Sequence, residues 1–61
     1  MTKILNCSNY SLTCEYIVAR LVDDDWWFYG AWNDAERAYA AAMAEGGQVF
    51  KTSEVHAEVW G

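Results

Sequence analysis

VDDDWWFYGAWND, residues 22–34, holds three of the chain's four tryptophans and four of its nine acidic residues. Three consecutive aspartates favour a turn, because Asp tolerates turn conformations that most side chains avoid. The aromatic run that follows, 26–32, suits a half-buried pleated surface and predicts a strand. Upstream, 15–22 is apolar and rich in β-branched residues, which also favours a strand. Together the two runs predict a hairpin.

The register of this hairpin follows if Asp24 and Asp25 are the central turn residues and Asp23 faces Trp26. Side chains alternate between the two faces of a strand. The core face would then carry Ile17, Ala19, Leu21, Phe28, Gly30 and Trp32. The opposite face would carry Tyr16, Val18, Arg20, Val22, Trp27, Tyr29 and Ala31. A three-residue turn would shift this register.

A helix is predicted over 34–45. Asn33 is expected to cap it, with Glu36 three residues later completing a capping box. Apolar residues recur at helical spacing and predict one buried stripe; they are Ala35, Ala38, Tyr39, Ala42 and Met43. Gly46-Gly47 supplies the left-handed residue that ends a helix.

The remaining segments are harder to interpret. Residues 48–60 predict one strand, or two joined at 52–54, and 1–13 predict a short strand and a loop. The expected fold class is α+β: a single small domain in β-β-α-β order. Its three- or four-stranded, mostly antiparallel sheet would have one helix packed on one face. At 61 residues the chain forms one domain at most.

The charge of the chain is acidic, with a formal net charge of −5. Only four Lys and Arg are present, whereas nucleic-acid binding needs clustered cations that displace counterions from phosphates. We therefore expect no direct contact with nucleic acid. No apolar run approaches the length of a transmembrane helix, so no membrane contact is expected either. The N-terminus lacks the apolar core of a signal peptide, which predicts a cytoplasmic protein.

Residues that carry chemistry do not gather in the sequence. Cys7, Cys14 and His56 lack the close pair spacing of zinc ligands. Asp23–Asp25 has no glycine that would turn the chain around a calcium ion. We expect no catalytic residue, no metal and no cofactor. If 4–7 and 14–18 paired as a hairpin, the two sulfurs would lie close together, so the sequence leaves both a disulfide and free thiols open.

Two surface features exceed what folding requires. One helix covers one face of a small sheet, so the face with Trp27 and Tyr29 would stay exposed, and exposed aromatic patches commonly mark an interface. The second feature is charge: Asp23–Asp25 and Glu45 are expected to lie at one end of the domain. The predicted partner-binding residues are Asp23, Asp24, Asp25, Trp27, Tyr29 and Glu45.

In size, acidity and single-domain α+β character, the whole chain resembles the anti-CRISPR proteins that bacteriophages encode. The resemblance rests on no shared motif. It implies a stoichiometric inhibitor that imitates the charge of DNA and occupies a basic, nucleic-acid-binding surface of a bacterial effector protein. The alternative is a small homodimeric or accessory interaction module that associates through its exposed aromatic sheet face.

Overall fold

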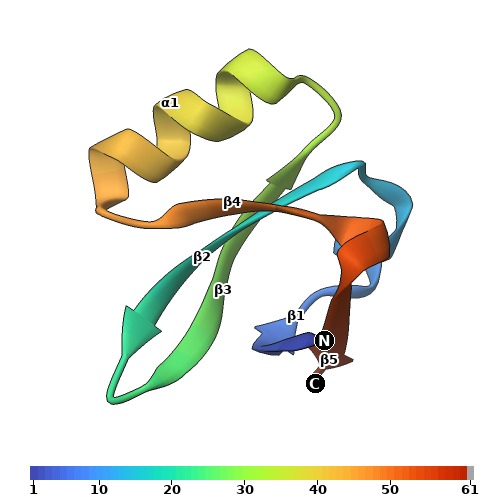
Figure 1. The fold of residues 1–61 in the computed structure, drawn as a ribbon. Helices are drawn as coiled ribbons and strands as arrows, with labels where there is room; N and C mark the ends of the chain where they lie inside the picture. The colour runs from blue at the N-terminus through green and yellow to red at the C-terminus, as the bar shows by residue number, and fades with distance from the viewer. Residues whose placement is uncertain (61) are drawn as a thin grey trace.

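The computed structural model describes residues 1–60 of the chain. In this range the chain forms five strands, one α-helix and two short 3-10 helices (Figure 1). Their bounds in chain order are β1 Thr2–Cys7, η1 Asn9–Thr13, β2 Tyr16–Val22, β3 Asp25–Trp32, α1 Ala35–Glu45, β4 Gln48–Lys51, η2 Thr52–Glu54 and β5 Val55–Val59. The domain is α+β with a single helix.

The sheet differs in detail from the expected three or four mostly antiparallel strands. It has five strands in the order β4-β2-β3-β1-β5. β2 pairs antiparallel with β3 and β4, whereas β1 pairs parallel with both β3 and β5. The β-β-α-β order did not count the short strand expected within 1–13, which is β1. Of the two alternatives for 48–60, the structure has two strands joined at 52–54. The N-terminal strand enters the sheet between β3 and β5.

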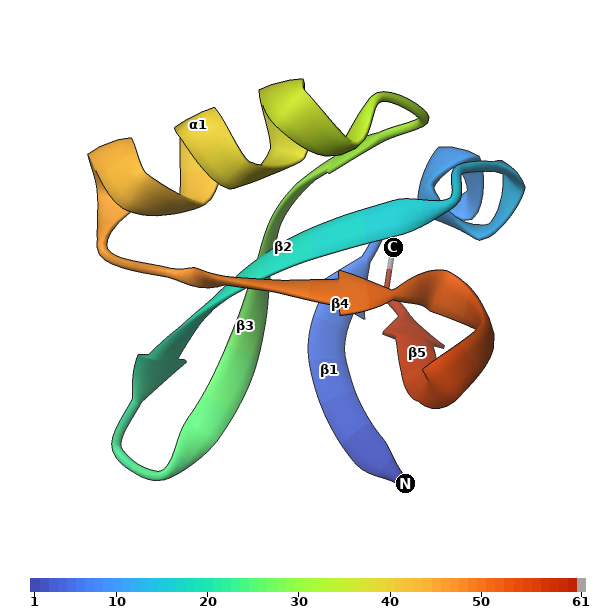
Figure 2. The same ribbon diagram turned by 45° about the horizontal axis from the view of Figure 1, so that its top comes forward.

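The sheet curls strongly. β4 and β5 lie at opposite edges, yet only the three residues of η2 separate them in the chain (Figure 2). The curl encloses one core cluster on the concave side, made by Ile4, Cys7, Ile17, Ala19 and Val55. Trp26 and Phe28 pack against this cluster from β3. The strands themselves therefore fill the face that the sequence had assigned to the helix.

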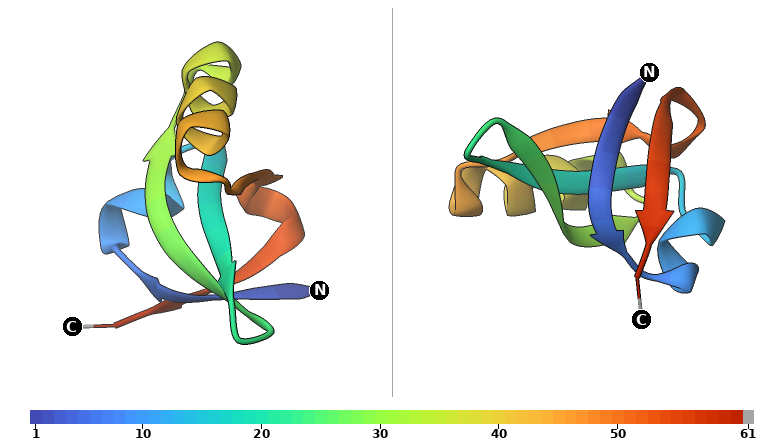
Figure 3. Two further views of the ribbon diagram at one scale, coloured as in Figure 1. Left: turned by 90° about the vertical axis from the view of Figure 1, so that its left-hand side faces the viewer. Right: turned by 90° about the horizontal axis from the view of Figure 1, so that it is seen from below.

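The helix packs on the opposite, convex side of the sheet (Figure 3). A second cluster there joins Val18 to Ala38 and Ala42, and Tyr16, Trp32, Ala41 and Val49 pack around it. The prediction that Tyr16 and Val18 would stay uncovered is therefore wrong. α1 covers the end of β2 that carries them, and it leaves the hairpin end of the same face open.

The hairpin register also differs from the expectation. Asp23 and Asp24 are the central turn residues, with φ of 50° and 69°, and Val22 pairs with Asp25. This offset from the predicted pairing is two residues, so it leaves the faces of Trp27 and Phe28 as predicted. A bulge between Val18 and Ala19 then reverses the alternation beyond Tyr29. Trp32 consequently faces the helix instead of the concave core.

The helix begins and ends close to its predicted bounds, but its cap is a different residue. Asp34 is the N-cap, and its carboxylate accepts a hydrogen bond from the backbone N–H of Glu36 at 3.0 Å. The amide oxygen of Asn33 instead accepts from the N–H of Glu15 at 3.0 Å. This bond ties the start of α1 to the start of β2. Gly46, at φ 68°, ends the helix.

The buried stripe of the helix lies to one side of the predicted one. Ala38 and Ala42 are buried, but Tyr39 and Met43 are 59% and 85% exposed. Only small side chains fit where α1 approaches the sheet, so alanines occupy the face of the helix that contacts the sheet. Tyr39 and Met43 are left facing solvent on the β4 flank of α1, where they line hollows beside that strand.

Candidate protein-binding surface

The acidic turn lies at the tip of a hairpin that projects from the body of the domain (Figure 1). Asp23 and Asp24 are the two turn residues, and Asp25 begins β3. All three are exposed. None of the ion pairs found among residues 1–60 includes them. The tip therefore presents three adjacent carboxylates without a neutralising cation.

The turn geometry explains only part of this sequence. Two consecutive residues with positive φ form a type I′ turn, which matches the twist of a hairpin and favours Asn-Gly or Asp-Gly. A left-handed conformation costs a non-glycine residue about 1–2 kcal/mol, although Asp and Asn tolerate it better than most. Asp23 therefore suits the first turn position, whereas the turn favours glycine at the position of Asp24 and requires no acid at Asp25. The charge of the tip exceeds what folding requires.

Trp27 and Tyr29 lie on the face opposite Ile17, as predicted, but this is the convex face on which α1 packs. Trp27 pairs with Arg20 across the hairpin, and Tyr29 is the bulged residue. Tyr29 is 42% exposed and lies 6.4 Å from the Trp32 ring at an interplanar angle of 23°. The Arg20 guanidinium lies 5.5 Å from the centre of the Tyr29 ring. Tyr29 therefore lies near both a cation and an indole, while part of the residue stays accessible.

Glu45 is already engaged within the protein. Its Oε1 lies 3.8 Å from Nη1 of Arg20, and both side chains are partly exposed. Such a pair contributes little to stability in water. It nevertheless places a positive charge beside Glu45, and the same guanidinium lies near the Tyr29 ring. Glu45 therefore lies near Tyr29, because Arg20 contacts both side chains, and its charge is already paired with that of Arg20.

Trp60 is a surface aromatic that the sequence analysis did not include among the binding residues. Its ring meets Trp27 edge to face, with centroids 5.5 Å apart and planes at 90°. Its backbone N–H donates to the carbonyl of Cys7 at 3.2 Å, and its indole N–H donates to Glu58 at 3.0 Å. Trp60 is 45% exposed. Only the parallel pairing of β5 with β1 brings it beside Trp27, so no local pattern indicates the contact.

The convex face therefore carries an aromatic corner formed by Trp27, Tyr29 and Trp60. The corner continues along the hairpin to Val22, which is 48% exposed and pairs with Asp25. The acidic tip and the aromatic corner thus belong to the same hairpin. An incoming protein would meet carboxylates at the tip and ring surfaces behind it.

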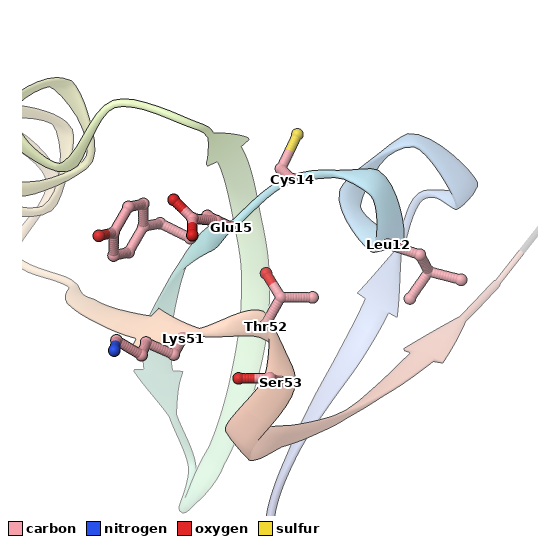
Figure 4. Close-up of a pocket in the computed structure, with 7 residues that line it drawn as sticks. Leu12, Cys14, Glu15, Lys51, Thr52 and Ser53 are labelled. Atoms are coloured by element: carbon pink, nitrogen blue, oxygen red, sulfur yellow. The ribbon is translucent and has the colours of Figure 1, made fainter.

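A separate hollow lies between η1, the start of β2 and the β4–η2 junction (Figure 4). Its volume is about 480 Å³, and Glu15, Lys51, Thr52 and Ser53 are among its lining residues. Cys14 also belongs to the lining, but its sulfur points away from Thr52 and Ser53 and lies 3.7 Å from the Tyr10 carbonyl. His56 belongs to β5 and does not line the hollow. The arrangement therefore offers no thiol or hydroxyl paired with a histidine base.

Both cysteines are free and buried. β1 pairs with β3 and β5 rather than with β2, so the hairpin that would have joined the two thiols does not form. The Cys7 thiol donates to the Ile4 carbonyl at 3.3 Å. Burial raises the pKa of this thiol above its ordinary value of 9.0. Cys7 is thereby kept protonated and is a poor nucleophile.

We expect Cys7 to react with iodoacetamide at least about 100-fold more slowly in the folded protein than in denaturant, because reaction requires opening of the core. The raised pKa also sets the direction in which pH changes the stability of the fold. The stability that Cys7 contributes is fully present below the pKa of its thiol in the unfolded chain, and it is lost as pH rises through the pKa of the thiol in the folded protein. Mass spectrometry of quenched samples measures the rate, with Thr13→Cys as an exposed reference. Equal rates at Cys7 and at that reference site would contradict the burial.

Comparisons with protein-family models, with curated proteins and with solved structures gave no significant match. Within residues 1–60, α1 is too short and too polar to cross a membrane, and no other helix there is longer. In the same range, no three His, Cys, Asp or Glu side chains gather as metal ligands would.

Proposed function

We propose that this protein is a non-enzymatic inhibitor that occupies a basic, nucleic-acid-binding surface of a bacterial effector protein. The observation that carries the proposal is the exposed, unpaired Asp23–Asp25 cluster at the tip of a projecting hairpin. The likeness of the whole chain in size and charge to the phage-encoded anti-CRISPR proteins supports the same proposal. A phage-encoded inhibitor of this kind would act in the host cytoplasm.

The charge at the tip suits a surface that normally holds phosphates. Asp23, Asp24 and Asp25 are adjacent in the chain, so three negative charges gather at one tight turn. Each DNA strand also carries closely spaced negative charges, one for every ~3.4 Å of helix axis. The tip therefore offers a short, dense cluster of negative charge to a surface that binds phosphates. Complementary charge of this sort raises association rates and discriminates against acidic surfaces.

The aromatic corner would supply apolar contact area, which charge alone does not provide. Trp and Tyr are the residues that most often dominate binding energy at interfaces. Trp27 and Tyr29 are expected to anchor the contact, and Trp60 joins them because its ring packs on Trp27. Glu45 has a weaker part in this proposal than Asp23–Asp25, since Arg20 already neutralises it. The binding surface is thus acidic at its tip and apolar behind it.

The test begins with affinity capture from bacterial lysate and identification of the retained protein by mass spectrometry. The captured protein is then purified, and its affinity is measured for two variants with equal loss of charge. The first combines Asp23→Asn, Asp24→Asn and Asp25→Asn, which keeps the turn because Asn also adopts positive φ. The second combines Glu15→Gln, Asp34→Asn and Glu36→Gln, which keeps the helix cap because Asn also caps.

We expect the hairpin variant to bind at least about tenfold more weakly, and the control variant to change by less than about twofold. The partner's nucleic acid should compete with the protein for binding. Equal loss in both variants would mean that net charge, and not the tip, attracts the partner. Simultaneous binding of nucleic acid and this protein would overturn the proposal.

A further inference from the structure

The free edge of β4 has a defined hydrogen-bonding pattern. The N–H of Thr52 donates to the carbonyl of Glu15 at 2.9 Å, and the register makes these residues directly opposite. In an antiparallel pair, residues alternate between those that exchange hydrogen bonds with the partner strand and those that face away from it. Phe50 and Gln48 therefore bond to β2, whereas Val49 and Lys51 direct their backbone groups outward.

These outward groups have no backbone partner within residues 1–60. β4 pairs only with β2, and no turn or loop bond in that range reaches Val49 or Lys51. Two N–H and two C=O groups thus lie in a row along an open edge. Such a row is a template for another extended chain.

The edge is bordered by two adjoining hollows of about 430 and 330 Å³. Tyr39 and Val49 line both of them, and Met43 lines the smaller one. The strand runs beneath α1 (Figure 2), so the hollows form a trough between the helix and the open edge. The exposed Tyr39 and Met43, which the helix does not bury against the sheet, form the apolar wall of this trough.

We propose that the β4 edge binds an extended segment of a partner protein, which adds as an antiparallel strand and alternates apolar with basic residues. This inference is independent of the hairpin tip and of the proposed inhibition. Backbone bonds to Val49 and Lys51 would supply affinity, and the trough would select side chains, as in other cases of strand addition.

The charge near the β4 edge, and the alternation of side chains between the two faces of an added strand, specify which kind of segment fits. The side chain of Val49 lies on the helix face and that of Phe50 on the other. Residues opposite Val49 and Lys51 share the helix face, so apolar side chains there would contact Tyr39 and Met43. Their neighbours point to the other face, that of Phe50. The larger hollow reaches both faces, since Val49 and Phe50 both line it, and Glu54 also belongs to its lining. The Glu54 carboxylate therefore favours a basic side chain in the added segment.

A short segment fits this surface better than a second copy of the chain. Stable interfaces use about 20–30 residues from each partner. Nine residues line the larger hollow and six the smaller, with two shared. Two copies would also bring together net charges of −5 each. A basic segment, in contrast, is attracted by that charge.

The probe is a capped hexapeptide of alternating lysine and valine. Amide hydrogen exchange, measured by NMR, reports directly on the edge. Saturating peptide should slow exchange at Val49 and Lys51 by about fivefold to tenfold, the effect of one hydrogen bond at each amide. Exchange at Phe50 should stay nearly constant because that N–H already bonds to β2.

Two methylated probes of equal charge separate strand addition from simple attraction to an acidic protein. In the antiparallel register, the valine N–H groups face β4 and the lysine N–H groups face solvent. N-methylation of the valines should abolish the slowing, and N-methylation of the lysines should preserve it. Val49→Pro should also weaken binding while the fold persists, since a proline is tolerated where the lost N–H points outward.

A matched pair of tyrosine variants tests the trough. Tyr39→Ala should weaken the peptide about fivefold or more, and Tyr10→Ala, which removes another exposed tyrosine, should not. The proposal is overturned if both methylated peptides bind alike, or if exchange at Val49 and Lys51 is unchanged at about 1 mM peptide. It is also overturned if light scattering shows a dimer that Val49→Pro dissociates, because the edge would then bind a second copy.

Discussion

Replacing Ile17 with alanine is expected to destabilise the protein by about 2–5 kcal/mol, the range for large-to-small changes in a closed core. Ile17 has no exposed surface and packs in the concave cluster with Ile4 and Val55. The cavity cannot easily collapse, since strands surround it on both sides. A chain of 61 residues has about 3–9 kcal/mol of stability to lose. The variant should therefore approach or cross the point of unfolding at 25 °C.

Denaturation followed by tryptophan fluorescence measures this effect. Ile17→Val removes one methylene and should destabilise by about 0.5–1.5 kcal/mol. Leu12→Ala is the exposed control, because Leu12 is 52% exposed. If Ile17→Ala cost no more than Leu12→Ala, the concave cluster would not be the main core. The wild-type curve provides the reference for all three variants.

Replacing Gly30 with alanine is expected to destabilise the protein by about 1–3 kcal/mol through overpacking. A Cβ at Gly30 would lie 2.6 and 2.8 Å from two ring carbons of Trp32. The indole has little room to move, because it packs with Val18 and Ala38 beneath the helix. The effect is steric alone, since the φ of Gly30 lies outside the left-handed region.

A double-mutant cycle tests this explanation. Trp32→Leu removes the ring that the new Cβ would meet, so Gly30→Ala should cost far less in that background. Gly46→Ala is a useful contrast: nothing lies within 4 Å of its Cβ, and its cost comes from a φ of 68°. The loss at Gly46 should not depend on Trp32. An additive result at Gly30 and Trp32 would refute the proposed clash.

The helix was the most predictable element because its signals are local. A cap residue, a run of alanines and a terminal glycine all act within one or two turns. Even so, the cap moved by one residue, from Asn33 to Asp34. Asn33 makes a bond to Glu15, which lies 18 positions away. No local pattern distinguishes a residue that caps a helix from one that joins a distant strand.

The assignment of faces failed at a bulge. Alternation correctly placed Phe28 on the face of Ile17, where it packs against the concave core cluster. Beyond Tyr29 the extra residue reverses the alternation, and Trp32 turns to the helix face. The glycine at position 30 is compatible with this outcome, because the Trp32 ring needs the space above it. A bulge depends on how two strands fit, which a single strand does not reveal.

Local patterns in the sequence were enough to predict the hairpin, the helix and the acidic tip, because turns, caps and alternating strands depend on neighbouring residues. Asp23–Asp25, Trp27 and Tyr29 are therefore visible as one local stretch. Local patterns could not predict three features of the folded chain: the entry of β1 into the sheet, the packing of Trp60 on Trp27, and the ion pair of Arg20 with Glu45. They also could not predict that the edge of β4 stays open beside Tyr39. These contacts join residues far apart in the chain, and they follow from the curl and order of the whole sheet.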